Sequence, residues 1–369
     1  MSSQCSIRAV TVIADILRPC GDGSPGEVDR MTRWVADAIR PAVRLAASLP
    51  VESVTTDEIP KLRAWVAAQR PPSQADAWWA RHHGSRPRSR LLDDMILDRL
   101  EHRFCVGYEM PPWLVAMLDE AGIPYVDIRL HPIRFLDDLI FAVRGADPEI
   151  QACLAPLALP LAAPHVAAGL LVAMGRYISQ ARIPPGTLLI AGQRRFDSTQ
   201  IADGRFFDAE PRAETIHAIC RDYKAVVLKP HPHDQQHTLL HVAAGVPSQI
   251  LGILGDNAYR LLSLPEIEAV LTVNSGLGLE APYFGKRVHT LLPYAISLAW
   301  QDAPDAGSHL GIGDTVLVPD FWRLVLGPHM PVSAPDGYRL PAKPNRLRIA
   351  LDSFWNFHQV DTDRIPRTD

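Results

Sequence analysis

The sequence predicts a protein of two Rossmann-like α/β domains, each built on a parallel sheet with crossover helices. Strand-like and helix-like stretches alternate along the chain, and the alternation stops at a turn-rich segment and then restarts. The length of 369 residues also favours two domains over one. We expect the domains to face a central cleft, because open parallel sheets bind ligands beyond the carboxyl ends of their strands.

The first domain is expected over residues 1–182. Pro111 and Pro112 open a helix with an apolar stripe, and Gly122 ends it. A strand on either side of this helix completes a strand–helix–strand unit, which is typical of a parallel sheet. The strands are expected at residues 7–17, 103–109 and 123–130, and a further helix at residues 57–69.

The segment ARIPPGT, residues 181–187, is stiff and rich in turn formers, and we place the domain boundary there. The second domain is expected over residues 188–340, with a C-terminal helix and tail at 341–369 that pack back on the first domain. Its strands are expected at 188–191, 225–228, 269–273 and 288–292, and its helices at 212–223, 235–244 and 277–284.

Composition excludes several classes of protein. The net charge of -4, with both signs spread along the chain, gives no reason to expect a nucleic-acid partner. The five cysteines are scattered, which argues against a disulfide framework or a zinc site and fits a reducing cytoplasm. The first ten residues lack the pattern of a signal peptide, so we expect a cytoplasmic protein.

The chain is strongly apolar at residues 152–174 and almost long enough there to span a bilayer. Pro156, Pro160 and Pro164 recur inside this stretch and remove helical hydrogen-bond donors. We therefore expect a buried, broken helical segment. The alternative is a peripheral contact with the inner membrane.

A group of polar residues follows the predicted strand at 225–228. Two prolines fix the backbone there, and a lysine and two histidines crowd the end of the strand, where they can hold an anionic phosphate. The alternative is an exposed polar loop. The residues are Lys229, Pro230, His231, Pro232, His233 and Asp234.

Two further loops follow predicted strands of the second domain. The loop NSGLGLE begins at Asn274, and its small residues expose backbone N–H groups that favour an anion, although plain loop-to-helix geometry gives the same pattern. Glu280 in this loop can accept hydrogen bonds from ribose hydroxyls. The loop GQRRFDST carries Asp197, which is a candidate catalytic carboxylate or, alternatively, a turn or helix cap.

Taken together, GQRRFDSTQI, VVLKPHPHD and VLTVNSGLGLEAPYFGKRVHT resemble, in this order, the motifs of the capsule polysaccharide biosynthesis family. This family includes bacterial β-Kdo transferases. GYEMPP, residues 107–112, and DIRLHPIRFLDDL, residues 127–139, are similar to the acceptor-side domain of the family. Pro282 stands in place of an expected leucine, and the glycines of the loop after the third motif are missing.

The resemblance implies a GT-B-like glycosyltransferase that transfers Kdo from CMP-β-Kdo with retention, in capsule or lipopolysaccharide O-antigen synthesis. The first domain would hold a saccharide or lipid-linked acceptor. Asp197 would be the nucleophile and His231 would assist the departing phosphate. The donor would be bound by Gln193, Lys229, Pro232, Asn274, Ser275, Gly276 and Glu280.

Three cationic residues, Arg129, His131 and Arg134, lie at and after the end of the predicted strand at 123–130. Kdo carries a carboxylate, which arginine recognises by bidentate pairing, so these residues are candidates for binding substrate. The alternative is salt bridging to the nearby aspartates at 127, 137 and 138.

No DxD-like pair is placed to bind a metal, so we expect a metal-independent enzyme without a cofactor. Three other functions stay open. They are a transferase for another CMP-ulosonate such as a sialic acid, a nucleotide-sugar epimerase or hydrolase, and a non-catalytic assembly scaffold.

Overall fold

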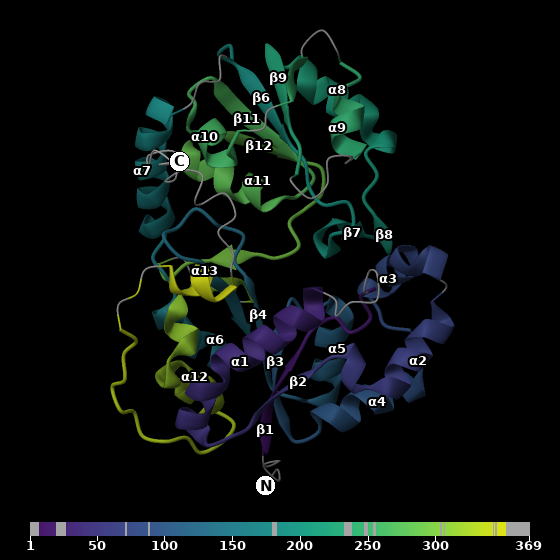
Figure 1. The fold of residues 1–369 in the computed structure, drawn as a ribbon, viewed down its shortest axis with the longest axis vertical. Helices are drawn as coiled ribbons and strands as arrows, with labels where there is room; N and C mark the ends of the chain where they lie inside the picture. The colour runs from purple at the N-terminus through teal and green to yellow at the C-terminus, as the bar shows by residue number, and fades with distance from the viewer. Residues whose placement is uncertain are drawn as a thin grey trace, which may run out of the picture.

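The computed structural model describes residues 7–19, 27–70, 72–87, 89–178, 183–231, 238–246, 250–253, 256–302, 305, 307–341, 343 and 345–351. These residues form two α/β domains stacked along the long axis of the molecule (Figure 1). The predicted fold class of two Rossmann-like α/β domains is therefore confirmed, but the first sheet is mixed and not parallel throughout as expected.

The first domain contains a seven-stranded sheet in the order β13-β14-β5-β4-β3-β1-β2. The strands β1 to β4 are parallel, and β5 is antiparallel to both of its neighbours. The strands are β1 (Ala9–Ile13), β2 (Val51–Val54), β3 (Arg103–Tyr108), β4 (Tyr125–Leu130), β5 (Phe141–Gly145), β13 (Leu298–Ala299) and β14 (His309–Ile312).

Helices cover both faces of this sheet and bury its strands on both sides. One core lies under α1 (Glu27–Ala47), α6 (Pro148–Leu154) and α12 (Pro319–Leu326). The other lies under α2, α4 and α5. The remaining bounds are α2 (Pro60–Gln69), α3 (Ala75–His83), α4 (Arg90–Leu100), α5 (Pro112–Ala121) and α13 (Arg346–Leu351).

The second domain contains a parallel sheet in the order β10-β9-β6-β11-β12. Its strands are β6 (Thr187–Ala191), β9 (Ala225–Lys229), β10 (Ile250–Ile253), β11 (Ile267–Thr272) and β12 (Arg287–Thr290). Its helices are α7 (Ala162–Ile178), α8 (Ala213–Arg221), α9 (Thr238–Ala243), α10 (Ala258–Ser263) and α11 (Gly276–Glu280). A hairpin of β7 (Ile201–Ala202) and β8 (Arg205–Phe206) extends from this domain.

Short 3-10 helices complete several connections. They are η1 (Thr56–Glu58), η2 (Pro72–Gln74), η3 (Ala155–Leu157), η4 (Ser198–Gln200), η5 (Glu210–Arg212), η7 (Ala281–Phe284) and η8 (Asp314–Leu317).

The domain limits in the structure differ from the expected ones in two places. Helix α7 precedes the expected boundary at residue 182, but it packs on α10 and belongs to the core of the second domain. Strands β13 and β14 lie within the expected range 188–340, but they join the sheet of the first domain. The physical reason is that β14 pairs with β5, which would otherwise present an open edge.

The apolar segment at residues 152–174 is broken, as expected, between η3 and α7. The expectation that it is buried is wrong for one face of α7, where Val166 is 64% and Leu170 62% exposed. The opposite face packs on α10. Among the described residues no single helix is long and apolar enough to cross a membrane. The helical segments Pro148–Leu157 and Ala162–Met174, which meet at a bend of 43°, have that length and apolar character only when taken together.

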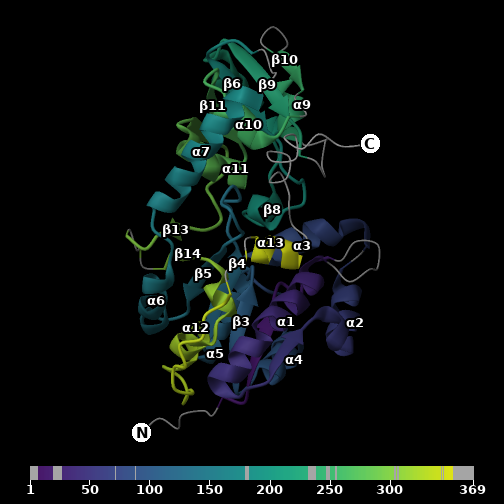
Figure 2. The ribbon, with the colours of Figure 1, turned by 60° about the vertical axis from the view of Figure 1, so that its left-hand side comes forward.

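The C-terminal helix α13 lies at the junction between the two domains (Figure 2). Asp138 accepts hydrogen bonds from the backbone N–H groups of Leu347 and Arg348, at 2.9 and 3.0 Å. The buried Arg348 side chain donates to the carbonyls of Arg134, Leu136 and Asp137, at 2.6, 2.7 and 3.3 Å. The helix therefore fixes the shape of the loop that follows β4.

Replacing Arg348 with methionine should lower the free energy of unfolding by about 2–3 kcal/mol, because it removes the donor from several buried carbonyls. Urea denaturation measures this change. Ile349→Ala is the matched control, since Ile349 is 49% exposed on the same helix and its truncation should cost less than about 0.5 kcal/mol. Equal losses in the two variants would contradict the structural role of Arg348.

Candidate functional site

Both sheets have a point where the strand order reverses, and these points face the domain junction. In the second sheet the reversal lies between β6 and β11, and in the first sheet between β1 and β3. Loops at such points diverge, which opens a crevice beyond the carboxyl ends of the strands where α/β proteins bind ligands. The candidate site is therefore built from the loops that follow these four strands and β9.

Hydrogen bonds between side chains join the loops after β6 and β11. Gln193 Nε2 donates to Asn274 Oδ1 at 3.1 Å and to Thr199 Oγ1 at 2.9 Å. Asn274 Nδ2 donates to the carbonyls of Thr199 and Pro293, at 2.6 and 3.1 Å. Gln193 and Asn274 are buried and use their amides on each other, so they shape the site and do not lie open to a donor nucleotide.

This network also holds Asp197. The residue caps η4, and its Oδ1 accepts hydrogen bonds from the backbone N–H and the hydroxyl of Thr199, both at 2.9 Å. The structure describes no hydrogen bond to Oδ2, and the side chain is half-buried. The capping role considered above is therefore real, and it orients a carboxylate that keeps one oxygen for a ligand.

Lys229 and His231 lie at the end of β9. Lys229 Nζ donates to the carbonyl of Asp256 at 2.6 Å, and burial lowers the pKa of Lys229. His231 is half-buried, and its backbone N would lie 2.9 Å from a Cβ atom on Gly192. Glycine is thus required at position 192 for the loops after β6 and β9 to approach each other. The predicted Pro232, His233 and Asp234 lie outside the described residues.

The loop after β11 touches the first domain. Ser275 caps α11 by accepting a hydrogen bond from the backbone N–H of Leu277 at 3.4 Å. A Cβ atom on Gly276 would lie 3.2 Å from the carbonyl oxygen of Pro132, which follows β4 of the first domain. Gly276 therefore permits close contact between the domains.

Glu280 links the two domains and does not face a ribose. It is 3% exposed, and its Oε1 accepts hydrogen bonds from the backbone N–H of Arg134 at 2.6 Å and from the hydroxyl of Tyr259 at 3.0 Å. Burial raises the pKa of Glu280 to about 7, against the opposing effect of these two hydrogen bonds. The ribose contact expected from the sequence is not what this geometry favours.

The three residues considered for the Kdo carboxylate, Arg129, His131 and Arg134, have different surroundings. Arg129 forms a salt bridge with Asp127 at 2.9 Å, which was the alternative considered above. His131 is fully buried, its Nδ1 accepts a hydrogen bond from the Ile133 N–H at 3.1 Å, and burial lowers its pKa to about 3. Arg134 is half-buried, and among the described residues its guanidinium has no ion pair, so it is the best placed of the three to bind an anion.

Glu109 was not singled out from the sequence as a site residue, although it lies in the GYEMPP motif. It follows β3 directly and adopts a left-handed conformation with φ 49°, which is uncommon for any residue but glycine. Burial raises the pKa of Glu109, the charges of Arg129 and Arg18 oppose this, and the charge of Asp197 adds to it. A carboxyl group of each domain therefore lies within electrostatic reach of the other.

Arg18 and His83 complete the first-domain side of the site. Arg18 follows β1 and lies over the Trp79 ring, 5.0 Å from its centroid. Asp15 is buried and accepts hydrogen bonds from the indole N–H groups of Trp79 and Trp113, at 2.7 and 3.2 Å. Burial lowers the pKa of His83, and the charges of Asp15 and Asp197 raise it. No sequence motif indicated that these residues meet.

The β7–β8 hairpin connects the Asp197 loop to the first domain. The Phe206 ring lies 5.6 Å from the Trp79 ring and 5.2 Å from the Phe196 ring, between centroids. Gly204 has φ 73°, and a Cβ atom there would lie 3.4 Å from the Cα of Arg81. Packing against α3 thus holds the loop that carries Asp197 close to Glu109.

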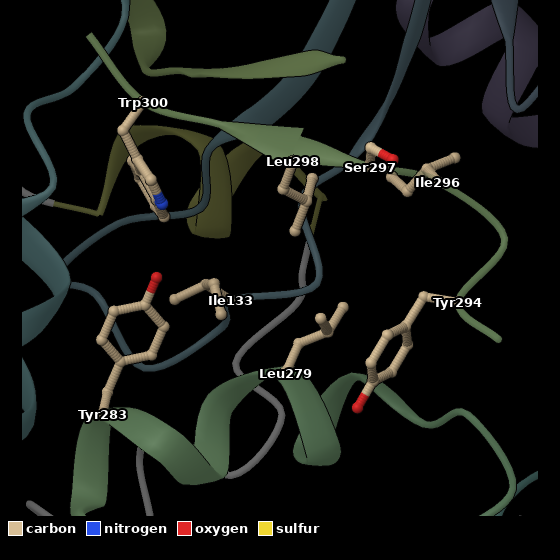
Figure 3. A pocket seen from close by; sticks show the side chains of 8 residues that line it. All are labelled: Ile133, Leu279, Tyr283, Tyr294, Ile296, Ser297, Leu298 and Trp300. Atoms are coloured by element: carbon tan, nitrogen blue, oxygen red, sulfur yellow. The ribbon is translucent and has the colours of Figure 1, made fainter. Parts of the chain in front are cut away.

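A pocket of about 510 Å³ is lined by residues of both domains. In Figure 3 the Tyr283 and Trp300 side chains face each other at one end and Tyr294 lies at the other. The lining residues are Ile133, Leu279, Tyr283, Tyr294, Ile296, Ser297, Leu298 and Trp300. None of them is ionised at neutral pH, so the pocket offers aromatic and aliphatic contact and no group for acid–base chemistry. The parts of the chain that the structure describes contain no group of three potential metal ligands.

Comparison with known proteins gives similarity at the level of structure. No protein-family model matches the sequence, and no curated protein matches it. A Thermosulfurimonas dismutans KpsC structure described as a β-Kdo 2,7 transferase is 15% identical, with a TM-score of 0.34 over 55% of this chain and 69% of that one. A second, described as a β-Kdo 2,4 transferase, is also 15% identical, with a TM-score of 0.33 over 50% and 67%.

A third similar structure is UDP-GlcNAc 2-epimerase from Neisseria meningitidis bound to UDP-GlcNAc. It is 9% identical, with a TM-score of 0.32 over 86% of this chain and 94% of that one. At TM-scores this low, the likeness gives no information about the activity of the present chain.

The buried Glu280 predicts a pH-dependent stability. Its pKa is 4.5 without the fold and about 7 within it, so the folded protein holds the proton more tightly between these values. The contribution of Glu280 is complete below about pH 4.5 and is lost as pH rises through about 7, by at most roughly 3 kcal/mol. Urea unfolding of the wild type at several pH values in this range measures the loss.

Glu280→Gln cannot ionise and should lack this part of the pH dependence. Glu214→Gln, at an exposed position of α8, is the control and should follow the wild type. If Glu280→Gln also follows the wild type across the range, the assigned protonation of Glu280 is wrong.

Proposed function

We propose that this chain is a retaining glycosyltransferase that transfers Kdo from CMP-β-Kdo to a saccharide acceptor in capsule or O-antigen synthesis. One observation carries the proposal: Asp197 of the second domain and Glu109 of the first lie within electrostatic reach, at the points where the strand orders reverse. Two carboxyl groups are what a double displacement at an anomeric carbon requires. The motif resemblance supplies the sugar and the nucleotide.

In the first step, an oxygen of Asp197 attacks the anomeric carbon of Kdo. The bond from that carbon to the phosphate oxygen breaks, and its electron pair leaves with CMP. We assign Lys229 and His231, at the end of β9, to the charge that develops on the phosphate. The hydrogen bonds from Thr199 orient the attacking carboxylate.

In the second step, an acceptor hydroxyl attacks the same carbon from the face that CMP has left. Glu109 takes the hydroxyl proton, and the bond to Asp197 breaks and returns a free carboxylate. A raised pKa makes Glu109 a stronger base than an exposed glutamate, which suits this task near neutral pH. Two inversions at one carbon give net retention.

The positive groups around this pair fit an anionic sugar. Arg134 is the side chain we assign to the Kdo carboxylate, and Arg18 lies near enough to affect Glu109 and His83. Arg129 is engaged with Asp127. We further propose that the reaction needs no metal ion, and that the protein works in the cytoplasm on a saccharide or lipid-linked acceptor, at the inner membrane if the acceptor is anchored there.

The choice of nucleotide can be tested by thermal shift. CMP should raise the melting temperature, while UDP and GDP should not, because a ligand that binds only the folded state stabilises it. Equal stabilisation by UDP would remove the CMP assignment. It would also favour a different class of nucleotide sugar, including the substrates of an epimerase.

Asp197→Asn should abolish transfer while leaving folding and CMP binding intact, because the substitution is nearly isosteric and an amide cannot act as the nucleophile. Incubation of the wild type with CMP-Kdo alone should add the mass of one Kdo residue within residues 192–199, as measured by peptide mass spectrometry. Asp208→Asn is the control and should retain activity, because Asp208 is an exposed carboxylate that follows the β7–β8 hairpin.

Glu109→Gln separates the two steps. It should still form the adduct on Asp197, but transfer to the acceptor should be slower by roughly 10²–10⁴-fold. An adduct on another carboxylate, or an inverted product, is incompatible with the proposed nucleophile. Release of free Kdo at the full rate without an acceptor would identify a hydrolase.

A further inference from the structure

Asp127 lies at the centre of a buried charged cluster directly behind Glu109. It is on β4 and only 1% exposed. Its Oδ1 accepts a hydrogen bond from the backbone N–H of Met110 at 3.3 Å. Its Oδ2 accepts from Arg129 Nη2 and contacts His309 Nε2, both at 2.9 Å. Three groups from three separate segments of the chain therefore converge on one carboxylate.

His309 reaches this cluster from the far end of the chain. It begins β14, the strand by which the chain returns to the first sheet, and lies 182 residues from Asp127 in sequence. Burial lowers the pKa of His309, against the opposing hydrogen bond to Asp127, so the ring is neutral at neutral pH. A neutral ring that hydrogen-bonds a carboxylate through Nε2 carries its proton there. Its Nδ1 is buried without a hydrogen-bond partner among the described residues.

The cluster fixes the backbone on both sides of Glu109. The N–H of Glu109 donates to the carbonyl of Ile128 at 3.0 Å, and the next N–H, that of Met110, donates to Asp127. Glu109 itself has φ 49°, a conformation that persists only where neighbouring contacts impose it. The Asp127 carboxylate supplies one such contact, through the Met110 N–H.

The cluster also fixes a charge that faces Glu109. Arg129 is one of the groups whose charge acts on Glu109, together with Arg18 after β1, Arg134 after β4 and Asp197 of the second domain. The salt bridge to Asp127 holds the Arg129 guanidinium in place and offsets its charge. Arg144, beside Asp127 in the register of β5, completes the charged groups on this part of the sheet.

We propose that Asp127 and His309 are positioning residues for Glu109. In this arrangement His309 holds Asp127, and Asp127 holds both the left-handed turn at Glu109 and the guanidinium of Arg129. The catalytic consequence rests on the proposed function, whereas the geometric one concerns Glu109 whether or not the chain transfers a sugar.

The direction of the effect on Glu109 follows from charge. Asp127→Asn removes one negative charge and leaves Arg129 uncompensated. A nearby positive charge favours the ionised carboxylate, so the pKa of Glu109 should fall. The loss of the carboxylate also weakens the contact with the Met110 N–H and releases the turn.

The first measurement does not depend on activity. The protein is labelled with ¹³C at the glutamate carboxyl groups, and Glu109 is assigned by the signal that Glu109→Gln removes. Titration by NMR should show a pKa for Glu109 that is lower in Asp127→Asn than in the wild type. An unchanged titration of Glu109 in a folded Asp127→Asn protein would overturn the proposal.

The second measurement uses His309, in case Asp127→Asn does not fold. His309→Leu removes the donor to Asp127, while His309→Gln keeps a side-chain N–H. The leucine variant should shift the Glu109 ¹³C signal and lower kcat by roughly tenfold with little change in KM, and the glutamine variant should recover most of both. Thr32→Val is the control, because it removes a hydrogen bond from a buried hydroxyl to the Val28 carbonyl on α1 of the same domain, outside the cluster.

The outcomes separate this inference from the proposed function. A wild type without transferase activity, or a fully active Glu109→Gln, would contradict the proposed function. The NMR titration of Glu109 would still test whether Asp127 and His309 position that residue. If His309→Leu and Thr32→Val lose stability equally and neither moves the Glu109 signal, His309 has only a structural role and the inference is wrong.

Discussion

The burial of the loop after β4 in the core of the second domain is the constraint on which the rest of the structure depends. Ile133 and Phe135 of this loop lie in the same apolar cluster as Leu189 and Tyr259. Glu280 adds a hydrogen bond to the Arg134 N–H, which a buried carboxyl group can make only if the loop approaches closely. Because the loop and the second-domain helices share one core, the two sheets cannot separate without exposing apolar surface.

This constraint keeps the points where the two strand orders reverse on facing sides of the domain junction. Each reversal opens a crevice on its own sheet, but neither sheet alone supplies both carboxyl groups. The hairpin that follows Asp197 packs through Phe206 on Trp79, and Trp79 is held by the buried Asp15. The proposed nucleophile is therefore positioned from the domain that supplies the proposed base.

The return of the chain to the first domain adds a second level of control. Strand β14 closes the edge of β5 and delivers His309 to Asp127, and α13 then ties the Arg134 loop through Arg348. Two late segments of the chain, β14 and α13, thus support the residues of the first domain that face the junction. A site with such support needs few free side chains of its own, since neighbouring groups determine the orientation of each functional one.

The sequence by itself determined the fold class, seven of the fourteen strands in the described residues, and the loops that carry chemistry. These features depend on local patterns: apolar runs form buried strands, and the glycine at 122 ends a helix because it adopts a left-handed conformation at little cost. The same local reasoning placed Lys229 and His231 at the end of a strand and Asp197 in the loop after another, and the structure has them there, although their roles stay predictions.

Only the tertiary structure decided how those residues are used. Glu280 and Gln193 are polar residues in motif positions. Their side chains are buried by segments distant in the sequence, so Glu280 hydrogen-bonds the Arg134 N–H across the domain junction and Gln193 hydrogen-bonds Asn274. Glu109 gained its significance from a backbone conformation and from charges contributed by β4, the loops after β1 and β4, and the second domain. Local patterns carry no information about which distant segments meet. For this reason the return of β14 to the sheet of the first domain and the contact of His309 with Asp127 could not be predicted from the sequence.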